Sequence, residues 1–359
     1  MGDAAALQGI DAANVSTWLA ANVAGAVAPF SFDLIAGGRS NLTFRVTGAD
    51  GTRYVLRRPP VGLVLATAHD MAREHRLISA MGQTNVPVPA CLGLCTDPAV
   101  NGADFYVMAY VDGVVLDTPD RAATIAMPLR RQISENLVDV LADLHAVDVD
   151  AVGLGNLAKR EGYIERQVKR WSAQWAASKT FEISAVDEVA AYLQSHVPVQ
   201  QGVSIAHGDY RLGNCLTNTS TGAIAAVLDW ELCTLGDPLA DVGYLGVWWS
   251  DGPGSANTST DVTQAGGFLT YAEVVDRYAR RTGRDVSQVD FYVAFGCWRL
   301  AVINAGVYAR YLGGAMGEKL DDATLDDMKY RTKGLAEKAL AATQRCPARE
   351  WRTTVRQPS

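Results

Sequence analysis

Apolar residues recur at helical spacing in several parts of the chain. Within residues 133–144, isoleucine and leucine follow one another at intervals of four, four and three residues. This spacing places them on one face of a helix, which we expect to end before Asp148. The same kind of pattern predicts helices at residues 11–28, with Asp11 as the capping residue, at 69–81 and at 291–311.

Three short segments near the start of the chain are instead rich in β-branched and aromatic residues. They are residues 30–35, 42–46 and 53–57, and glycine-containing breaks separate them. Runs of this kind between turn residues predict β-strands. A further strand that leads into a turn is expected at residues 104–113, and the remainder of the chain reads mostly helical.

A polar stretch lies between short apolar runs in the second half of the chain. It has the pattern H-x-D-x-x-x-x-N, formed by His207, Asp209 and Asn214, and a further acid, Asp229, follows fifteen residues after the asparagine. Residues 217–222 are polar turn formers that suit a tight reversal. The pattern predicts a loop, a strand, a turn and a strand. This layout would hold Asp209, Asn214 and Asp229 together at one edge of a small sheet.

Composition limits the classes of function. The 359 residues are 48% hydrophobic and 20% charged, with a formal net charge of −7, so we expect a folded globular protein. A nucleic-acid-binding protein normally carries a basic face, so nucleic acid is not expected as a partner. We expect no membrane-spanning helix, because no run of about 18 apolar residues occurs, and no basic signal-peptide region. The six scattered cysteines predict reduced thiols in a cytoplasmic protein.

The polar stretch contains the types of side chain that transfer of a phosphoryl group from a nucleotide requires. One carboxylate orients the attacking hydroxyl, while an amide oxygen and a second carboxylate hold magnesium on the phosphates. The stretch resembles the catalytic loop of the protein-kinase-like superfamily. It is most similar to the aminoglycoside phosphotransferase and choline kinase branch, where His-Gly-Asp replaces His-Arg-Asp. The alternative is a chance His-Gly-Asp sequence in a turn.

The resemblance extends over roughly residues 30–315, through the later Asp-Trp-Glu and Gly-Asp-Pro-x-x-Asp sequences. It is closest to the phosphotransferase domain that in other proteins is fused to acyl-CoA dehydrogenases. It implies a bilobal, protein-kinase-like α+β fold, with an antiparallel β small lobe and a mainly helical large lobe. The expected boundaries are 1–112 for the nucleotide-binding lobe, 113–345 for the catalytic and acceptor-binding lobe, and 346–359 for a loose tail.

The resemblance also implies roles for individual residues. Asp209 would be the catalytic base, and Asn214 and Asp229 would be the magnesium ligands. An acid at Asp241 would hold the backbone of the catalytic loop, and His207 would support that loop. The expected nucleotide-binding residues are Ser40 in the hairpin loop, Arg57 in place of the usual strand lysine, Glu74 as its partner, and Ala109 and Val111 for backbone contacts to adenine.

Several of these residues have ordinary structural alternatives. The Gly37-Gly38 segment could be a plain hairpin turn, and Arg57 and Arg58 could be a solvated pair on an edge strand. Glu74 could form a surface pair within its own helix. The aromatic and basic residues of 161–178 could line an acceptor pocket or simply pack a helix, and packing is the favoured interpretation.

The sequence therefore predicts an ATP- and magnesium-dependent phosphotransferase that acts on a hydroxyl group of a small molecule. An aminoglycoside and a hydroxyacyl thioester or other metabolite are both compatible acceptors. Two alternatives stay open: a kinase-shaped nucleotide-binding module without turnover, and an interaction partner of an acyl-CoA enzyme. Function does not follow from the fold alone.

Overall fold

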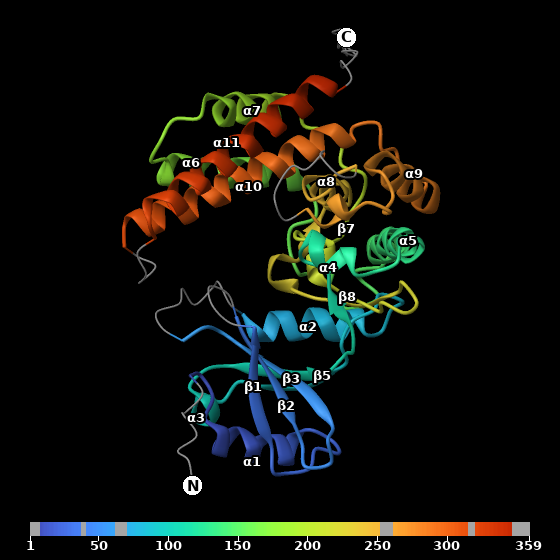
Figure 1. Ribbon diagram of the computed structural model, residues 1–359, viewed down its shortest axis with the longest axis vertical. Helices are drawn as coiled ribbons and strands as arrows, with labels where there is room; N and C mark the ends of the chain where they lie inside the picture. Colours follow the sequence, from blue (N-terminus) through green and yellow to red (C-terminus); the bar gives the residue numbers. More distant parts are fainter. Residues whose placement is uncertain (1–7, 37–40, 62–69, 252–260, 315–319, 347–359) are drawn as a thin grey trace, which may run out of the picture.

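The chain folds into two lobes. The structure is a computed structural model, and it describes residues 8–36, 41–61, 70–251, 261–314 and 320–346. A sheet-rich small lobe contains the N-terminal part of the chain, and a helical large lobe contains most of the remainder (Figure 1). The predicted bilobal α+β architecture is therefore confirmed.

The small lobe is built on a five-stranded antiparallel sheet with the strand order β1-β2-β3-β5-β4. Each predicted strand is present, and its ends agree with the expected ones to within a few residues. These strands are β1 (Ser31–Ala36), β2 (Leu42–Thr47), β3 (Arg53–Arg58) and β5 (Phe105–Ala109), while β4 (Cys91–Cys95) was not predicted. Because β3 lies in the centre of the sheet, its side chains alternate between two covered faces.

Two helices cover the sheet (Figure 1). Helix α1 (Ala12–Asn22) packs on one side through Val15 and Leu19, and α2 (Met71–Met81) contacts β4 and β5. Helix α1 is shorter than the predicted 11–28 segment, because Val23 is extended and Gly25 adopts a φ of 76°. That left-handed conformation cannot continue a helix.

The large lobe surrounds the apolar helix α10, which packs against α6, α7, α8 and α11. Its helices are α4 (Pro119–Ala123), α5 (Met127–His145), α6 (Tyr163–Ser178), α7 (Ser184–Ser195), α8 (Leu239–Val247), α9 (Tyr271–Thr282), α10 (Val289–Leu312) and α11 (Asp322–Arg345), and the short α3 (Pro98–Asn101) belongs to the small lobe. Helix α10 is long and apolar enough to cross a membrane by length and composition, contrary to our expectation. However, 83% of its apolar window is buried inside the fold, as in the core helix of a globular domain.

Small sheets of the large lobe carry the polar stretch. The chain passes through β7 (Ser204–Ala206), the 3-10 turn η1 (Leu212–Asn214), β8 (Cys215–Thr217) and β9 (Ile224–Val227). Strand β8 pairs with β9 and with β6 (Val114–Val115), while β7 pairs with β10 (Thr234–Gly236). A second 3-10 turn, η2 (Trp230–Leu232), follows Asp229 directly, and a third, η3 (Val262–Ala265), precedes α9. The predicted loop, strand, turn and strand are therefore confirmed.

The apolar layer between α1 and the sheet generates a prediction about stability. Phe44 in β2 is fully buried in this layer. Phe44→Ala removes a large buried ring, so it should lower the free energy of unfolding by about 3–5 kcal/mol. Val27→Ala, at a residue that is 46% exposed in the same lobe, should cost less than about 1 kcal/mol. Urea denaturation would measure both, and equal costs would contradict the packing.

Candidate active site

Arg57 of β3 joins the two lobes through carboxylates on both sides. Its Nε lies 3.1 Å from Glu74 Oε2 of α2, and its Nη2 lies 2.7 Å from Asp229 Oδ1 of the large lobe. The contact with Glu74 is an ion pair without good hydrogen-bond geometry, whereas Nη2 donates a hydrogen bond to Asp229. Burial acts to lower the pKa of Arg57, but the carboxylates of Glu74 and Asp229 raise it overall, so the guanidinium stays charged.

Glu74 is held by neutral donors as well as by Arg57. Its Oε1 accepts from Asn41 Nδ2 at 3.1 Å, and its Oε2 accepts from the Tyr106 hydroxyl at 2.9 Å. Glu74 is only 2% exposed. Burial raises the pKa of its carboxyl group, and Arg57 opposes that rise. The carboxylate thus has fixed partners on both oxygens, which fixes the orientation of Arg57 in turn.

The backbone at Asp229 is strained. Among the described residues Asp229 is the one non-glycine residue with a positive φ, 64°. Aspartate tolerates the left-handed region better than most residues, and such strain is concentrated at functional sites. The conformation turns the chain from β9 into η2, and Asp229 reaches Arg57 from that turn.

The loop of residues 207–214 positions Asp209 through its own asparagine. Asn214 Nδ2 donates to the Asp209 backbone carbonyl at 2.8 Å and to Asp209 Oδ2 at 2.7 Å. These bonds use both amide protons of Asn214, so its amide oxygen is left available as a ligand. Arg211 Nε lies 3.5 Å from Asp209 Oδ1. Burial raises the pKa of the neighbouring Tyr244, and the Asp209 carboxylate adds to that rise.

Asp241 of α8 holds the backbone of this loop. Its two oxygens accept from the backbone N–H groups of His207 at 2.7 Å and Gly208 at 2.8 Å. His145 lies 3.2 Å from Asp241 and 2.7 Å from the Tyr278 hydroxyl. Burial acts to raise the pKa of Asp241, but its hydrogen bond to His145 and the other polar contacts lower it overall. His145 is therefore a buried structural histidine.

His207 and Asn214 tie the loop to the chain before Asp229. His207 Nε2 lies 2.9 Å from the Leu228 carbonyl oxygen. The Leu228 N–H donates a hydrogen bond to the Asn214 carbonyl at 2.8 Å. His207 also packs against Trp230 with 4.9 Å between ring centroids. These contacts bring Asp209, Asn214 and Asp229 to one edge, as expected from the sequence.

Glu231 is an acid that the sequence analysis did not assign. Its Oε2 lies 3.9 Å from Arg57 Nη2 and is buried without a hydrogen-bond partner. Burial, followed by the nearby Asp229 carboxylate, raises the pKa of Glu231 to about 7. A buried carboxylate oxygen without a partner is costly, so it suits a cation. The signal was present in the Asp-Trp-Glu sequence, two positions after Asp229.

A mostly apolar cavity of about 270 Å³ lies between the lobes beside Arg57 and Asp229. Ala109 and Val111, the residues predicted for backbone contacts to adenine, line it together with Met108. The Ala109 N–H is already bonded to the Ala90 carbonyl at 2.8 Å. The Ala109 carbonyl and the Val111 N–H are the other backbone groups of this segment that a base could contact.

The structure corrects two of the alternatives. Arg57 and Arg58 are not a solvated edge pair, because β3 is central and Arg58 is only 7% exposed. Arg58 points to the opposite face and donates to the carbonyls of Gly9, Pro59 and Asn101. Glu74 is likewise buried and does not form a surface pair. Ser40 lies outside the described residues.

The site residues also fit a magnesium ion. Magnesium bound to a nucleotide takes one or two carboxylates and otherwise phosphate and water oxygens. The described residues contain no group of three or more histidine, cysteine or acidic side chains suited to a metal, but this mode of binding needs none. The Asn214 amide oxygen, the Asp229 carboxylate and the unpartnered Glu231 oxygen are all hard oxygen donors.

Comparison with known proteins agrees with this geometry. The sequence profile of the family described as "Phosphotransferase enzyme family" matches residues 31–292. Acyl-CoA dehydrogenase family member 10 of Mus musculus is 36% identical over 84% of the chain and 28% of its own length. Family member 11 of Gallus gallus is 33% identical over 86% of the chain and 40% of its own length. The chain thus spans well under half the length of these curated relatives.

Solved structures give the same result. A protein of Ralstonia eutropha JMP134, described as a candidate aminoglycoside phosphotransferase, has a TM-score of 0.80 and 32% identity, with 94% of this chain and 99% of that chain covered. Aminoglycoside phosphotransferase APH(4)-Ia, solved with ADP and hygromycin B, has a TM-score of 0.58 and 16% identity over 91% and 97% of the two chains, so it shows the fold alone. From the profile match and these relatives, the chain belongs to the phosphotransferase enzyme family.

Proposed function

We propose that the protein is an ATP- and magnesium-dependent phosphotransferase that acts on a hydroxyl group of a small molecule. The observation that carries this proposal is the joint placement of Asp209, Asn214 and Asp229 beside Arg57. An oriented carboxylate, oxygen donors for a metal and a fixed cation are the groups that phosphoryl transfer requires.

Asp209 would act on the acceptor. Its carboxylate orients the acceptor hydroxyl and takes its proton as the oxygen–phosphorus bond to the γ-phosphoryl group forms. The bond from the γ-phosphorus to the β–γ bridging oxygen breaks, and ADP leaves. Asn214 holds Asp209 Oδ2 at 2.7 Å, so the orientation of the base is fixed before the acceptor binds. Such positioning supplies much of the catalysis in phosphoryl transfer.

Asn214, Asp229 and Glu231 would hold the metal. When bound, magnesium neutralises charge on the β- and γ-phosphate oxygens. Asp229 pairs through Oδ1 with Arg57, and its second oxygen remains for the metal. Arg57 Nη1 has no partner among the residues described here, so it remains available for the α- and β-phosphates, while Ala109 and Val111 would read adenine in the apolar cavity. Ser40 stays a predicted phosphate contact.

The acceptor and the cellular location are also part of the proposal. The solved relative with hygromycin B is an aminoglycoside phosphotransferase, and the curated relatives carry acyl-CoA dehydrogenase names. An aminoglycoside and a hydroxyacyl thioester or other metabolite are therefore the acceptor classes to test. All six cysteines are free, which fits a reducing compartment such as the cytoplasm.

The direct test of the function is a screen of hydroxyl-bearing metabolites and aminoglycosides for acceptor-stimulated ADP release. Stimulation by one class of acceptor identifies the enzyme and its substrate class together. Magnesium-dependent nucleotide binding without stimulation by any compound favours the alternative of a binding module without turnover. Co-purification with an acyl-CoA enzyme would support the interaction partner.

Replacement of the two aspartates should separate catalysis from metal binding. Asp209→Asn should lower kcat by about 10²–10⁴-fold, because it removes the base, and leave nucleotide affinity intact. Asp229→Asn should weaken magnesium-nucleotide binding, because it removes a charged ligand. Steady-state kinetics and calorimetry on both variants measure this, with Glu188→Gln on the exposed face of α7 as the control. Full activity of Asp209→Asn would show that the assignment of the base is wrong.

Arg57 should require its forked geometry as well as its charge. Arg57→Ala should reduce kcat/KM for nucleotide more than about tenfold, equivalent to roughly 1.4 kcal/mol. Arg57→Lys should recover only part of that loss, because an ammonium group cannot reach Glu74, Asp229 and phosphate with a planar fork.

The neighbouring arginine provides the matched control. Arg58→Ala should leave kcat/KM nearly unchanged but lower the free energy of unfolding by roughly 1.5–3 kcal/mol, because it removes a charged donor from three carbonyls. Nucleotide kinetics and urea denaturation distinguish the two arginines. The reverse pattern, with Arg58 critical for kinetics and Arg57 dispensable, would rule out the proposed nucleotide contact.

A further inference from the structure

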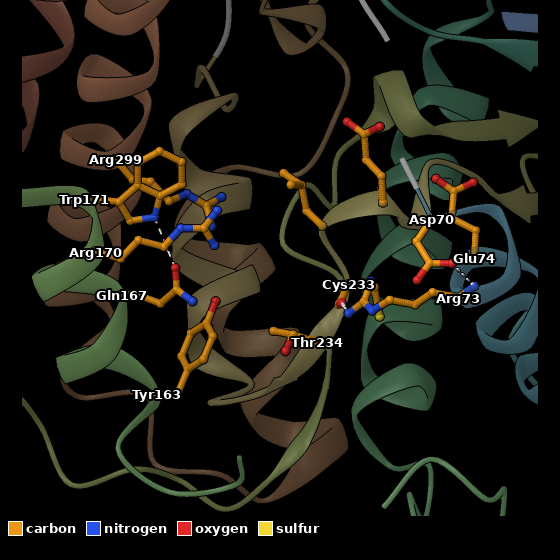
Figure 2. Close-up of a pocket in the computed structure, with 12 residues that line it drawn as sticks. Asp70, Arg73, Glu74, Tyr163, Gln167, Arg170, Trp171, Cys233, Thr234 and Arg299 are labelled. Carbon is orange, nitrogen blue, oxygen red and sulfur yellow. Dashed lines mark hydrogen bonds between the residues drawn. The ribbon is translucent and has the colours of Figure 1, made fainter. Parts of the chain in front are cut away.

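A second cavity, of about 560 Å³, opens next to the Arg57 cluster (Figure 2). Its walls come from the start of α2, the segment after Asp229, α6 and α10. The lining residues are Asp70, Arg73, Glu74, Tyr163, Gln167, Arg170, Trp171, Glu231, Leu232, Cys233, Thr234 and Arg299. The favoured prediction that 161–178 only packs a helix is therefore incomplete, because this face of α6 borders the cavity.

The acidic side chains of this cavity already have partners or lie beside the Arg57 cluster. Glu74 is engaged by Arg57 and by the Tyr106 hydroxyl, and Asp70 caps α2 by accepting from the Arg73 N–H at 2.8 Å. Glu231 faces Arg57 at 3.9 Å. Figure 2 places the labelled Asp70 and Glu74 at the α2 end, away from the arginines of α6 and α10.

Arg299 of α10 lies at the other end and is nearly enclosed. It is 6% exposed, its Nη2 donates to the Gly208 carbonyl at 2.5 Å, and its guanidinium lies 4.5 Å from the Tyr244 ring centroid. Its Nε is buried without a hydrogen-bond partner. No carboxylate pairs with it within the part of the chain that the structure describes, and a buried cation without a counter-ion is unfavourable.

Arg170 of α6 borders the same cavity. It is exposed and lies 5.2 Å from the Trp171 ring centroid, and it too has no carboxylate partner among the described side chains. In Figure 2 the side chains of Arg170 and Arg299 extend into the cavity from the same side, and their guanidinium groups lie next to each other in the view. Two converging guanidinium groups repel each other unless an anion lies between them. Both present planar forks that suit the oxygens of a carboxylate or phosphate.

We propose that Arg170 and Arg299 bind an oxyanion, a carboxylate or a phosphate, that the acceptor molecule carries. This inference rests on the proposed function and specifies the class of acceptor. Arg299 also holds the carbonyl of Gly208, the residue before Asp209, so the oxyanion is anchored to the same loop that carries the base. An anionic hydroxyl compound is favoured, and a polycation is disfavoured because it would meet two like charges.

A matched series of three-carbon alcohols tests the charge preference. Glycerol is neutral, glycerate carries a carboxylate, glycerol 3-phosphate carries a phosphate, and 3-amino-1,2-propanediol carries a cation. Ligand-observed NMR on the full chain at low ionic strength measures binding without the need for turnover. Glycerate or glycerol 3-phosphate should bind at least about tenfold more tightly than glycerol, and the stronger of the two identifies the oxyanion. Equal or tighter binding of glycerol or of the amine overturns the proposal.

Substitutions test whether Arg170 and Arg299 are the residues that bind the anion. Arg170→Gln, at an exposed residue, should remove most of the anion preference, while Lys169→Gln on the same helix and Arg310→Gln on α10 should change it less than about twofold. Arg299→Lys tests the buried position with its charge retained and should reduce anion binding through loss of the fork. Anion binding that survives in Arg170→Gln and Arg299→Lys alike overturns the site.

ADP release by the same four alcohols separates this inference from the function. Release stimulated by the amine or by glycerol, but by neither anion, overturns the oxyanion site and leaves the phosphotransferase activity standing. Anion binding that depends on Arg170, with no ADP release by any acceptor in the wider screen, supports the site and counts against the activity.

Discussion

The ionic contacts of Arg57 connect the two lobes. Glu74 in the small lobe and Asp229 in the large lobe lie 3.1 and 2.7 Å from one guanidinium. Removal of one partner of such a buried pair leaves an uncompensated charge, at a cost of about 3–5 kcal/mol. The geometry of the cleft therefore depends on this side chain. Asn41 and Tyr106 donate hydrogen bonds to Glu74. The strained turn at Asp229 brings the Asp229 carboxylate within reach of Arg57.

The loop that carries Asp209 is held separately, by contacts inside the large lobe. Asp241 accepts the N–H groups of His207 and Gly208, while Arg299 donates to the Gly208 carbonyl from the side of the second cavity. Asp209 thus projects from a backbone that is fixed on both faces. Because the same arginine borders the second cavity, the proposed acceptor recognition and the proposed orientation of the base would share one structural element.

Much of this arrangement could be predicted from the sequence. The resemblance correctly paired Arg57 with Glu74, and the H-x-D-x-x-x-x-N pattern indicated that Asp209 and Asn214 lie close together. Burial of Arg58 and the convergence of Arg170 with Arg299 could not be predicted, since they depend on contacts between segments more than 40 residues apart. Glu231 was missed although it lies two residues from Asp229. Its significance comes from burial, which a sequence pattern does not reveal.

The central claim is that the cleft beside Arg57, Asn214 and Asp229 binds a nucleotide together with magnesium. Calorimetric titration of the full chain with ATP, with and without magnesium, tests it most directly. The account predicts binding of one nucleotide per chain that tightens at least about tenfold when magnesium is present, because the metal joins the phosphates to Asn214 and Asp229. Absence of ATP binding, or an affinity for ATP that does not change when magnesium is added, would contradict it.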